Sequence, residues 1–150
     1  MILTEPNEKP SVLVVEDDEQ LQTALSHTLG GHGFAVSVVS DGYEGMDWLE
    51  RHGACLVLAD INLPGKSGLD MLRDIRLAGN QVPVVVMSAY ASVESAVQAL
   101  KLGASEFLEK PFPAKKLEEV IARIKGDEPT SKLSCSMKTA DESESPGFIT

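Results

Sequence analysis

Basic residues are scarce in this sequence. The 13 Lys and Arg residues are outnumbered by 23 Asp and Glu, which gives a formal net charge of −10 at pH 7 over 150 residues. A protein that binds a nucleic-acid backbone usually presents a basic face, often with aromatic side chains between the Lys and Arg residues. Neither feature is found, so we expect no direct contact with nucleic acid.

Long apolar runs are also lacking. No stretch approaches the roughly 20 residues that a membrane-spanning helix needs. The first ten residues, "MILTEPNEKP", have neither the basic start nor the apolar segment of a secretion signal. We therefore expect no membrane association and a cytoplasmic location.

Cysteine and histidine are few and have no metal-ligand spacing. Cys55 lies in an apolar run and Cys135 in a distant polar stretch, and neither belongs to a CxxC motif. We expect both cysteines to be reduced and chemically idle, and none of the three histidines to bind a metal.

Five apolar segments of strand length alternate with five segments of helical periodicity. The strand-like runs are "SVLVVE" at 11–16, "FAVSVV" at 34–39, "CLVLA" at 55–59, "VPVVVM" at 82–87 and "SEFLE" at 105–109. After each comes a segment whose apolar residues recur every three or four positions, as in Leu117, Val120, Ile121 and Ile124. The chain is long enough for one domain with a full core.

Strict alternation of this kind predicts an α/β fold with a parallel sheet covered by helices on both faces. The most apolar strands, at 11–16, 55–59 and 82–87, are expected in the middle, and the serine-containing strand at 34–39 at an edge. The flavodoxin-like, doubly wound five-stranded order 2-1-3-4-5 with five helices meets these constraints. It makes the first and third strands neighbours, and ligands bind such sheets beyond the carboxyl ends of those strands.

The two ends of the chain differ in character from the middle. Residues 127–150 are rich in Ser, Thr, Asp and Glu and have no apolar periodicity, so they cannot bury enough surface to offset the entropy of ordering. We expect a disordered leader at 1–10, one folded domain at 11–126 and a disordered tail at 127–150.

Polar residues follow the predicted strands and therefore meet at one edge of the sheet. They are Glu16, Asp17 and Asp18 after the first strand, Asp60 after the third, Ser88 after the fourth and Lys110 after the fifth. Asp17 and Asp60 would face each other about 5 Å apart, where two carboxylates repel unless a cation lies between them. Mg²⁺ prefers such oxygen ligands.

This set of side chains is suited to phosphoryl transfer onto Asp60. A carboxylate can attack an activated phosphoryl group when a metal ion and an ammonium group neutralise the phosphoryl oxygens. Taken alone, Asp60 would more often be an ordinary carboxylate at a strand end. Lys110-Pro111 alone could be a turn and Ser88 simply the end of a strand, whereas Asp18 has the position of a helix cap.

Four segments resemble the receiver domains of bacterial two-component response regulators. They are "VLVVEDDEQL", "LVLADINLPGKSGLDML", "VVVMSAY" and "GASEFLEKPF", which have the order and spacing of the family's signature blocks over residues 11–125. The resemblance implies that Asp60 accepts the phosphoryl group. It also implies that Glu16 and Asp17 form the acidic pair, and that Asp17, Asp60 and the main-chain carbonyl of Asn62 hold Mg²⁺.

The resemblance assigns further roles on the same edge. Ser88 would hydrogen-bond the phosphoryl group, Lys110 would pair with it, and Phe107 would be the aromatic residue that turns inward on activation. Asn62 and Tyr90 would flank the site and influence how fast water reaches the acyl phosphate. The family usually has a cis peptide bond before the proline that corresponds to Pro111.

The implied function is a switch rather than an enzyme acting on another substrate. The phosphoryl donor would be a sensor histidine kinase or a phosphotransfer protein. The output would be a downstream protein bound at the fourth helix, fifth strand and fifth helix, with a phosphorylation-dependent homodimer as a further expectation. Two alternatives are an aspartyl phosphohydrolase, which generally has a second acid where Asn62 stands, and a flavin carrier, for which the "EDDEQ" loop is too acidic.

Overall fold

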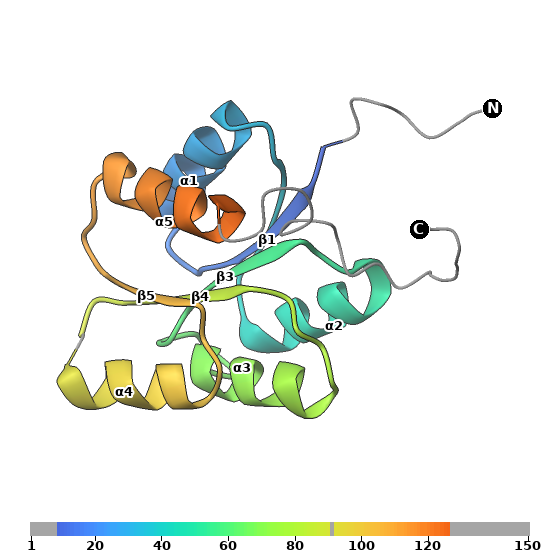
Figure 1. Ribbon diagram of the computed structural model, residues 1–150. Helices are drawn as coiled ribbons and strands as arrows, with labels where there is room; N and C mark the ends of the chain where they lie inside the picture. Colours follow the sequence, from blue (N-terminus) through green and yellow to red (C-terminus); the bar gives the residue numbers. More distant parts are fainter. Residues whose placement is uncertain (1–8, 91, 127–150) are drawn as a thin grey trace.

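The computed structural model describes residues 9–90 and 92–126, and these form a five-stranded parallel sheet between two layers of helices (Figure 1). The strands are β1 (Ser11–Val15), β2 (Ala35–Val39), β3 (Leu56–Asp60), β4 (Val84–Ser88) and β5 (Glu106–Glu109). The helices are α1 (Glu19–Gly31), α2 (Gly42–His52), α3 (Gly68–Leu77), α4 (Val93–Lys101) and α5 (Ala114–Gly126). Helices and strands alternate throughout, as predicted.

The strand order is β2-β1-β3-β4-β5, and every neighbouring pair is parallel. The predicted flavodoxin-like order is therefore confirmed, with β1 and β3 side by side and β2 at an edge. Of the expected leader at 1–10 and the expected tail at 127–150, the structure describes only residues 9 and 10.

Alternate residues of the central strands supply two separate cores. Val12, Val14, Leu56 and Leu58 face α1 and α5, where their neighbours include Leu25 and Leu117. Leu13, Val15, Val57 and Ala59 face the side of α2, α3 and α4, where Met71 and Leu72 pack. Because both faces of β1, β3 and β4 are covered, nearly every residue of these strands is apolar.

Side-chain caps fix where the helices begin. Asp18 accepts a hydrogen bond from the Gln20 amide at 3.0 Å, so its predicted role as the cap of α1 is confirmed. Asp41, Ser67 and Ser92 cap α2, α3 and α4 in the same way. Each helix starts just after the carboxyl edge of the sheet, so the loops that precede the helices gather around that edge.

No helix in 9–90 or 92–126 is both long enough and apolar enough to cross a membrane.

One sequence expectation is wrong within the core. Cys55, which is 1% exposed, is disulfide-bonded in the structure and is therefore not a reduced thiol. Cys135 lies outside the described residues.

Candidate functional site

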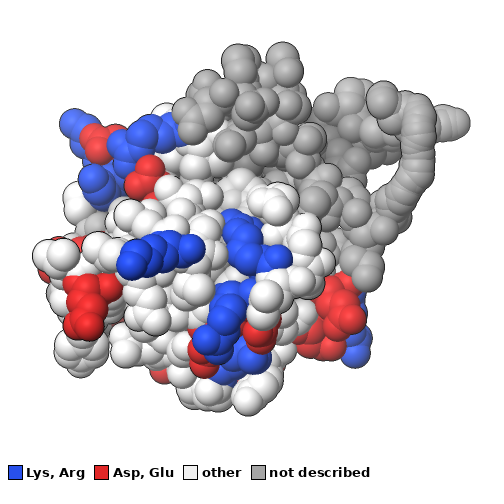
Figure 2. All heavy atoms as spheres, turned by 60° about the horizontal axis from the view of Figure 1, so that its bottom comes forward, with Lys and Arg blue, Asp and Glu red and all other residues white. Residues whose placement is uncertain are grey.

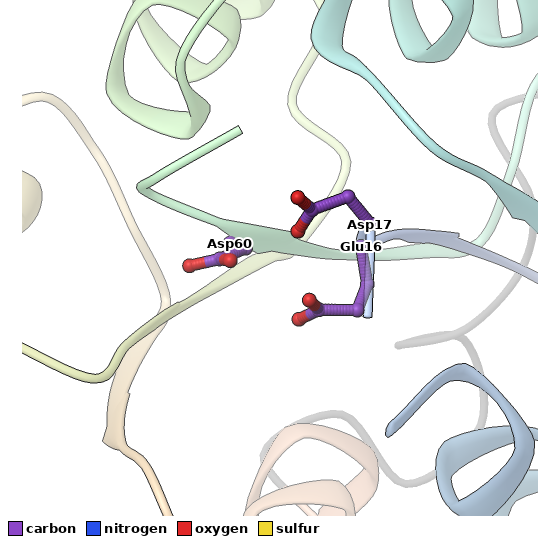
Figure 3. Close-up of side chains that lie close together, drawn as sticks. All are labelled: Glu16, Asp17 and Asp60. Carbon is purple, nitrogen blue, oxygen red and sulfur yellow. The ribbon is translucent and has the colours of Figure 1, made fainter. Parts of the chain in front are cut away.

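Two adjacent acids follow the last residue of β1 and differ in burial. Successive side chains of an extended segment alternate between its two sides. Glu16 is accordingly buried, with 1% of its surface exposed, whereas Asp17 is exposed. Figure 3 shows both carboxylates extending from the end of β1 toward the side where Asp60 lies. The amide of Asp18 donates a hydrogen bond to Glu16 Oε2 at 3.0 Å and holds that carboxylate in place.

Asp60 is the last residue of the central strand β3 and is 4% exposed. The residue before it, Ala59, pairs with Val15, so the register sets Asp60 beside the acids that follow β1. Carboxylate oxygens of Glu16, Asp17 and Asp60 lie within 4.8 Å of one another (Figure 3). The predicted proximity of Asp17 and Asp60 is thus observed.

Lys110 lies between the two buried acids. Its Nζ donates a hydrogen bond to Asp60 Oδ2 at 3.0 Å and lies 2.8 Å from Glu16 Oε1. Its amide donates to the Ser88 carbonyl at 2.8 Å, which continues the pairing of β4 with β5 by one residue. The peptide bond from Lys110 to Pro111 is cis, as the family resemblance implies.

The electrostatics of the pocket follow from burial and from these contacts. Burial raises the pKa of Glu16 above its usual value, and the nearby Lys110 only partly offsets this. Burial alone would lower the pKa of Lys110, but its contacts with Glu16 and Asp60 outweigh burial and raise it. Lys110 is therefore firmly charged at neutral pH.

One buried carboxylate oxygen in the pocket has an ion pair but no hydrogen bond from the described residues. Glu16 Oε1 is buried and accepts no hydrogen bond of good geometry from the described residues. It forms a 2.8 Å ion pair with Lys110 Nζ and keeps acceptor capacity for a further partner. A buried carboxylate oxygen with remaining acceptor capacity, next to two further carboxylates, is the donor set that a hard cation such as Mg²⁺ prefers.

The other predicted residues lie around the same edge. The Asn62 amide donates to Asp60 Oδ1 at 3.1 Å. Ser88 is 2% exposed and its Oγ accepts a hydrogen bond from the Tyr90 amide at 3.0 Å, while the Tyr90 side chain is 79% exposed. Phe107 on β5 is half-buried, pairs with Val86 and packs against the core on the α3 and α4 side.

Sequence reasoning missed Gln22, which supports the acidic pair from α1. Its Nε2 donates hydrogen bonds to the Glu16 carbonyl and to Ser40 Oγ, and so connects the end of β1 with the residue after β2. Gln22 lies on the turn of α1 that follows the Asp18 cap. The sequence holds no signal for this contact, because a polar residue in the first turn of a helix is common.

The carboxyl edge of this doubly wound sheet thus gathers three acids and one partly buried lysine. Residues 12–122 match the family described as the response regulator receiver domain. The chain belongs to this family, whose members act in two-component signal transduction.

The chain is similar to curated proteins named as regulatory or sensory transduction proteins. The chain is 39% identical over 118 residues to the uncharacterized transcriptional regulatory protein YkoG of Bacillus subtilis, which covers 79% of this chain and 50% of YkoG. It is 43% identical over 115 residues to the sensory transduction protein RegX3 of Mycolicibacterium smegmatis, covering 77% of this chain and 49% of RegX3. The chain thus spans about half the length of these two relatives.

Solved receiver domains have the same fold. The BeF3-activated receiver domain of Klebsiella pneumoniae RstA superposes with a TM-score of 0.71 at 32% identity, covering 75% of this chain and 96% of that one. The receiver domain of the sensor histidine kinase PA1611 from Pseudomonas aeruginosa superposes with a TM-score of 0.70 at 30% identity, covering 77% of this chain and 97% of that one. The latter structure has a magnesium ion coordinated in its active site cleft.

Proposed function

We propose that Asp60 accepts a phosphoryl group from the phosphohistidine of a sensor histidine kinase or a phosphotransfer protein, and that this acceptance switches a protein-binding surface. The observation that carries the proposal is the pair of contacts that Lys110 Nζ makes, 3.0 Å to Asp60 Oδ2 and 2.8 Å to Glu16 Oε1, inside an acidic pocket. A lysine held in this way is placed to pair with a dianionic phosphoryl group once that group is attached to Asp60.

The transfer exchanges one bond to phosphorus for another. A carboxylate oxygen of Asp60 forms a bond to phosphorus while the phosphorus–nitrogen bond of phosphohistidine breaks, and the imidazole nitrogen takes up a proton from solvent. The product is an acyl phosphate at the end of β3. Lys110 and the hydroxyl of Ser88 then contact the phosphoryl oxygens.

Asp17, Asp60 and the main-chain carbonyl of Asn62 would hold Mg²⁺, with Glu16 beside them. The buried Oε1 of Glu16, which accepts no hydrogen bond from the described residues, and the 4.8 Å grouping of the three carboxylates fit that ion. When bound, Mg²⁺ offsets the negative charge that gathers on the phosphoryl oxygens during transfer. The protein's part is to keep its carboxylates together and Asp60 aligned.

We propose that the output surface comprises α4, β5 and α5. Val93, Val97 and Leu100 of α4 are 82%, 44% and 54% exposed, an unusual amount of apolar surface for one helix. Figure 2 views the molecule from the side of α3 and α4, where uncharged residues predominate. Movement of Ser88 toward the phosphoryl group would let Phe107 turn inward and alter this surface, either for a downstream protein or for a second phosphorylated copy.

The domain would act as a switch and catalyse only its own phosphorylation and dephosphorylation. Asn62, not a second acid, follows two residues after Asp60, so the site lacks the general acid of an aspartyl phosphohydrolase. Because the ATP that supplies the partner kinase is found in the cytoplasm, we place the exchange there.

The test uses a small acyl phosphate as donor in the presence of Mg²⁺. We expect intact-mass spectrometry to show one added phosphate on the wild-type chain and none on Asp60→Asn. EDTA should abolish the addition. Equal labelling of the wild type and Asp60→Asn would disprove the assignment.

A further inference from the structure

The loop that follows Asp60 is held against α2 by an unusually close set of contacts. We call residues 61–67, between β3 and α3, the acceptor loop. It contains Asn62, whose amide donates to Asp60 Oδ1 at 3.1 Å and whose carbonyl is a proposed oxygen ligand. The position of this loop therefore sets the position of two groups in the site.

The base of the acceptor loop is closed by Gly68, the first residue of α3. Its amide donates to the Ile61 carbonyl at 3.1 Å. A Cβ atom at this position would lie 2.3 Å from the main-chain oxygen of Asp60, so only glycine permits the approach. The two ends of the loop are thus fixed next to each other. Only the tip of the loop, residues 64–66, can change position without moving the ends.

The tip of the acceptor loop rests on the first residue of α2. The amide of Gly42 donates to the Pro64 carbonyl at 3.4 Å. A Cβ atom on Gly42 would lie 1.9 Å from the carbonyl oxygen of Lys66, a distance that no rearrangement of side chains could relieve. Backbone therefore packs directly on backbone at this point.

Tyr43 adds a side-chain contact to the same tip. A Cβ atom on Gly65 would lie 2.9 Å from the Tyr43 ring, so the ring packs closely against this glycine. Gly65 also has a φ of 73°, a backbone conformation that disfavours other residues. Lys66 Nζ lies 5.6 Å from the centre of the same ring and forms a 2.6 Å ion pair with Asp74 of α3. The ring thus contacts the tip on one side while Lys66 connects it to α3.

Tyr43 is 63% exposed, so burial in the core does not explain its position. The helix that carries it is itself firmly placed. A Cβ atom on Gly45 would lie 3.0 Å from Val15, the residue before Glu16, and 2.8 Å from Met71 of α3. The start of α2 is therefore a fixed support for the acceptor loop.

We propose that Tyr43 is a positioning residue for the acceptor site. By resting on Gly65 and Lys66, its ring keeps the acceptor loop in the conformation in which the Asn62 main chain faces Asp60. Loss of the ring frees the tip, weakens Mg²⁺ binding and slows phosphorylation, although Tyr43 touches neither group. This role presupposes the acceptor site proposed at Asp60.

The experiment compares wild type with Tyr43→Ala, Tyr43→Phe and Gly42→Ala. Calorimetric titration gives the dissociation constant of Mg²⁺, and hydrogen exchange gives the protection of the Asn62 amide. For Tyr43→Ala we expect the dissociation constant to rise about tenfold, the low end of what loss of an outer partner of a metal ligand costs. The Asn62 amide should exchange faster, and Tyr43→Phe should behave as wild type because it keeps the ring.

A matched control separates positioning from general loss of stability. Ile121→Val lowers stability from within the core on the α1 and α5 side of the sheet, whereas Leu63 of the acceptor loop belongs to the core on the other side, so this variant should leave the Mg²⁺ dissociation constant and Asn62 exchange unchanged. Gly42→Ala should reproduce the effect of Tyr43→Ala or exceed it. If Tyr43→Ala retains wild-type affinity and wild-type Asn62 exchange, the positioning role is wrong.

The outcome is distinguishable from failure of the proposed function. If the wild type takes up phosphate and Tyr43→Ala matches it in affinity and exchange, Tyr43 has no such role and the acceptor site stands. If the wild type binds Mg²⁺ but takes up no phosphate at Asp60, the proposed function fails. Weaker Mg²⁺ binding and faster Asn62 exchange in Tyr43→Ala would still support the positioning role of Tyr43.

Discussion

Replacement of Lys110 by methionine should destabilise the protein strongly in the absence of metal. The side chains of Glu16 and Asp60 are 1% and 6% exposed, and Lys110, 15% exposed, forms an ion pair with each at 2.8 and 3.0 Å. At an effective dielectric constant of about 20, each pair contributes about 6 kcal/mol of gross attraction. Desolvation of the three groups cancels much of this, and removal of one partner from a buried pair typically costs about 3 to 5 kcal/mol.

We therefore expect Lys110→Met to lower the free energy of unfolding by about 3 kcal/mol at pH 7 in EDTA, near the lower limit because Lys110 retains some contact with water. Urea denaturation followed by circular dichroism measures this difference. Lys101→Met is the control, since Lys101 is an exposed lysine on α4 and such replacements change stability by less than about 0.5 kcal/mol.

The pH dependence of the stability lost in Lys110→Met gives a second check. Burial already raises the pKa of Glu16, and Lys110 opposes that rise. Without Lys110 the pKa of folded Glu16 rises further above its unfolded value, so its neutral form is favoured in the folded state. Stability from such a group is present at low pH and lost as pH rises through the folded pKa. The deficit of Lys110→Met should therefore shrink from pH 7 toward pH 5. A deficit under 1 kcal/mol at pH 7, or one that grows on acidification, would refute this account of the pocket.

Three further changes should have distinct effects. Asp17→Asn should raise the melting temperature without metal and reduce the stabilisation that Mg²⁺ binding gives. In the wild type this stabilisation should reach about 2.7 kcal/mol at a hundredfold excess of Mg²⁺ over its dissociation constant. Calorimetry at fixed ionic strength measures both effects. Ser88→Ala removes the acceptor of the Tyr90 amide, and urea denaturation should show a loss of about 1 kcal/mol. Labelling of Asp60 should persist in Ser88→Ala, but nuclear magnetic resonance shifts in α4 and β5 on phosphorylation should diminish. Arg76→Ala removes hydrogen bonds to the carbonyls of Asn80, Val82 and Gly103, and urea denaturation should show a loss of about 2 kcal/mol.

The sheet could be predicted because its signal is local. Valine-rich runs such as "VPVVVM" must be buried on both faces, and only a parallel sheet between helices provides that environment. The same logic located Asp60 correctly at the end of β3, since a charge directly after a buried strand has to lie at the sheet's edge.

Contacts between distant segments could not be predicted in this way. The approach of Gly42 to Lys66 and the support of Glu16 by Gln22 depend on how helices dock on the sheet, which leaves no periodic pattern. The arginine at position 76 reads as an ordinary residue of an exposed helix end, yet it reaches the loop before β5. The expectation for Cys55 failed for the same reason, because its bonding depends on the path of the chain and not on the residues beside it.

The central claim is that a phosphoryl group is attached to Asp60 and nowhere else. The most direct measurement treats the chain with a small acyl phosphate and Mg²⁺, reduces the product with borohydride, and maps it by peptide mass spectrometry. Reduction converts an aspartyl phosphate to homoserine and so marks the acceptor permanently. We predict homoserine at position 60 alone, with unmodified Asp17 and Asp18. Homoserine at either of these acids, or phosphate uptake that leaves Asp60 unchanged, would contradict the claim.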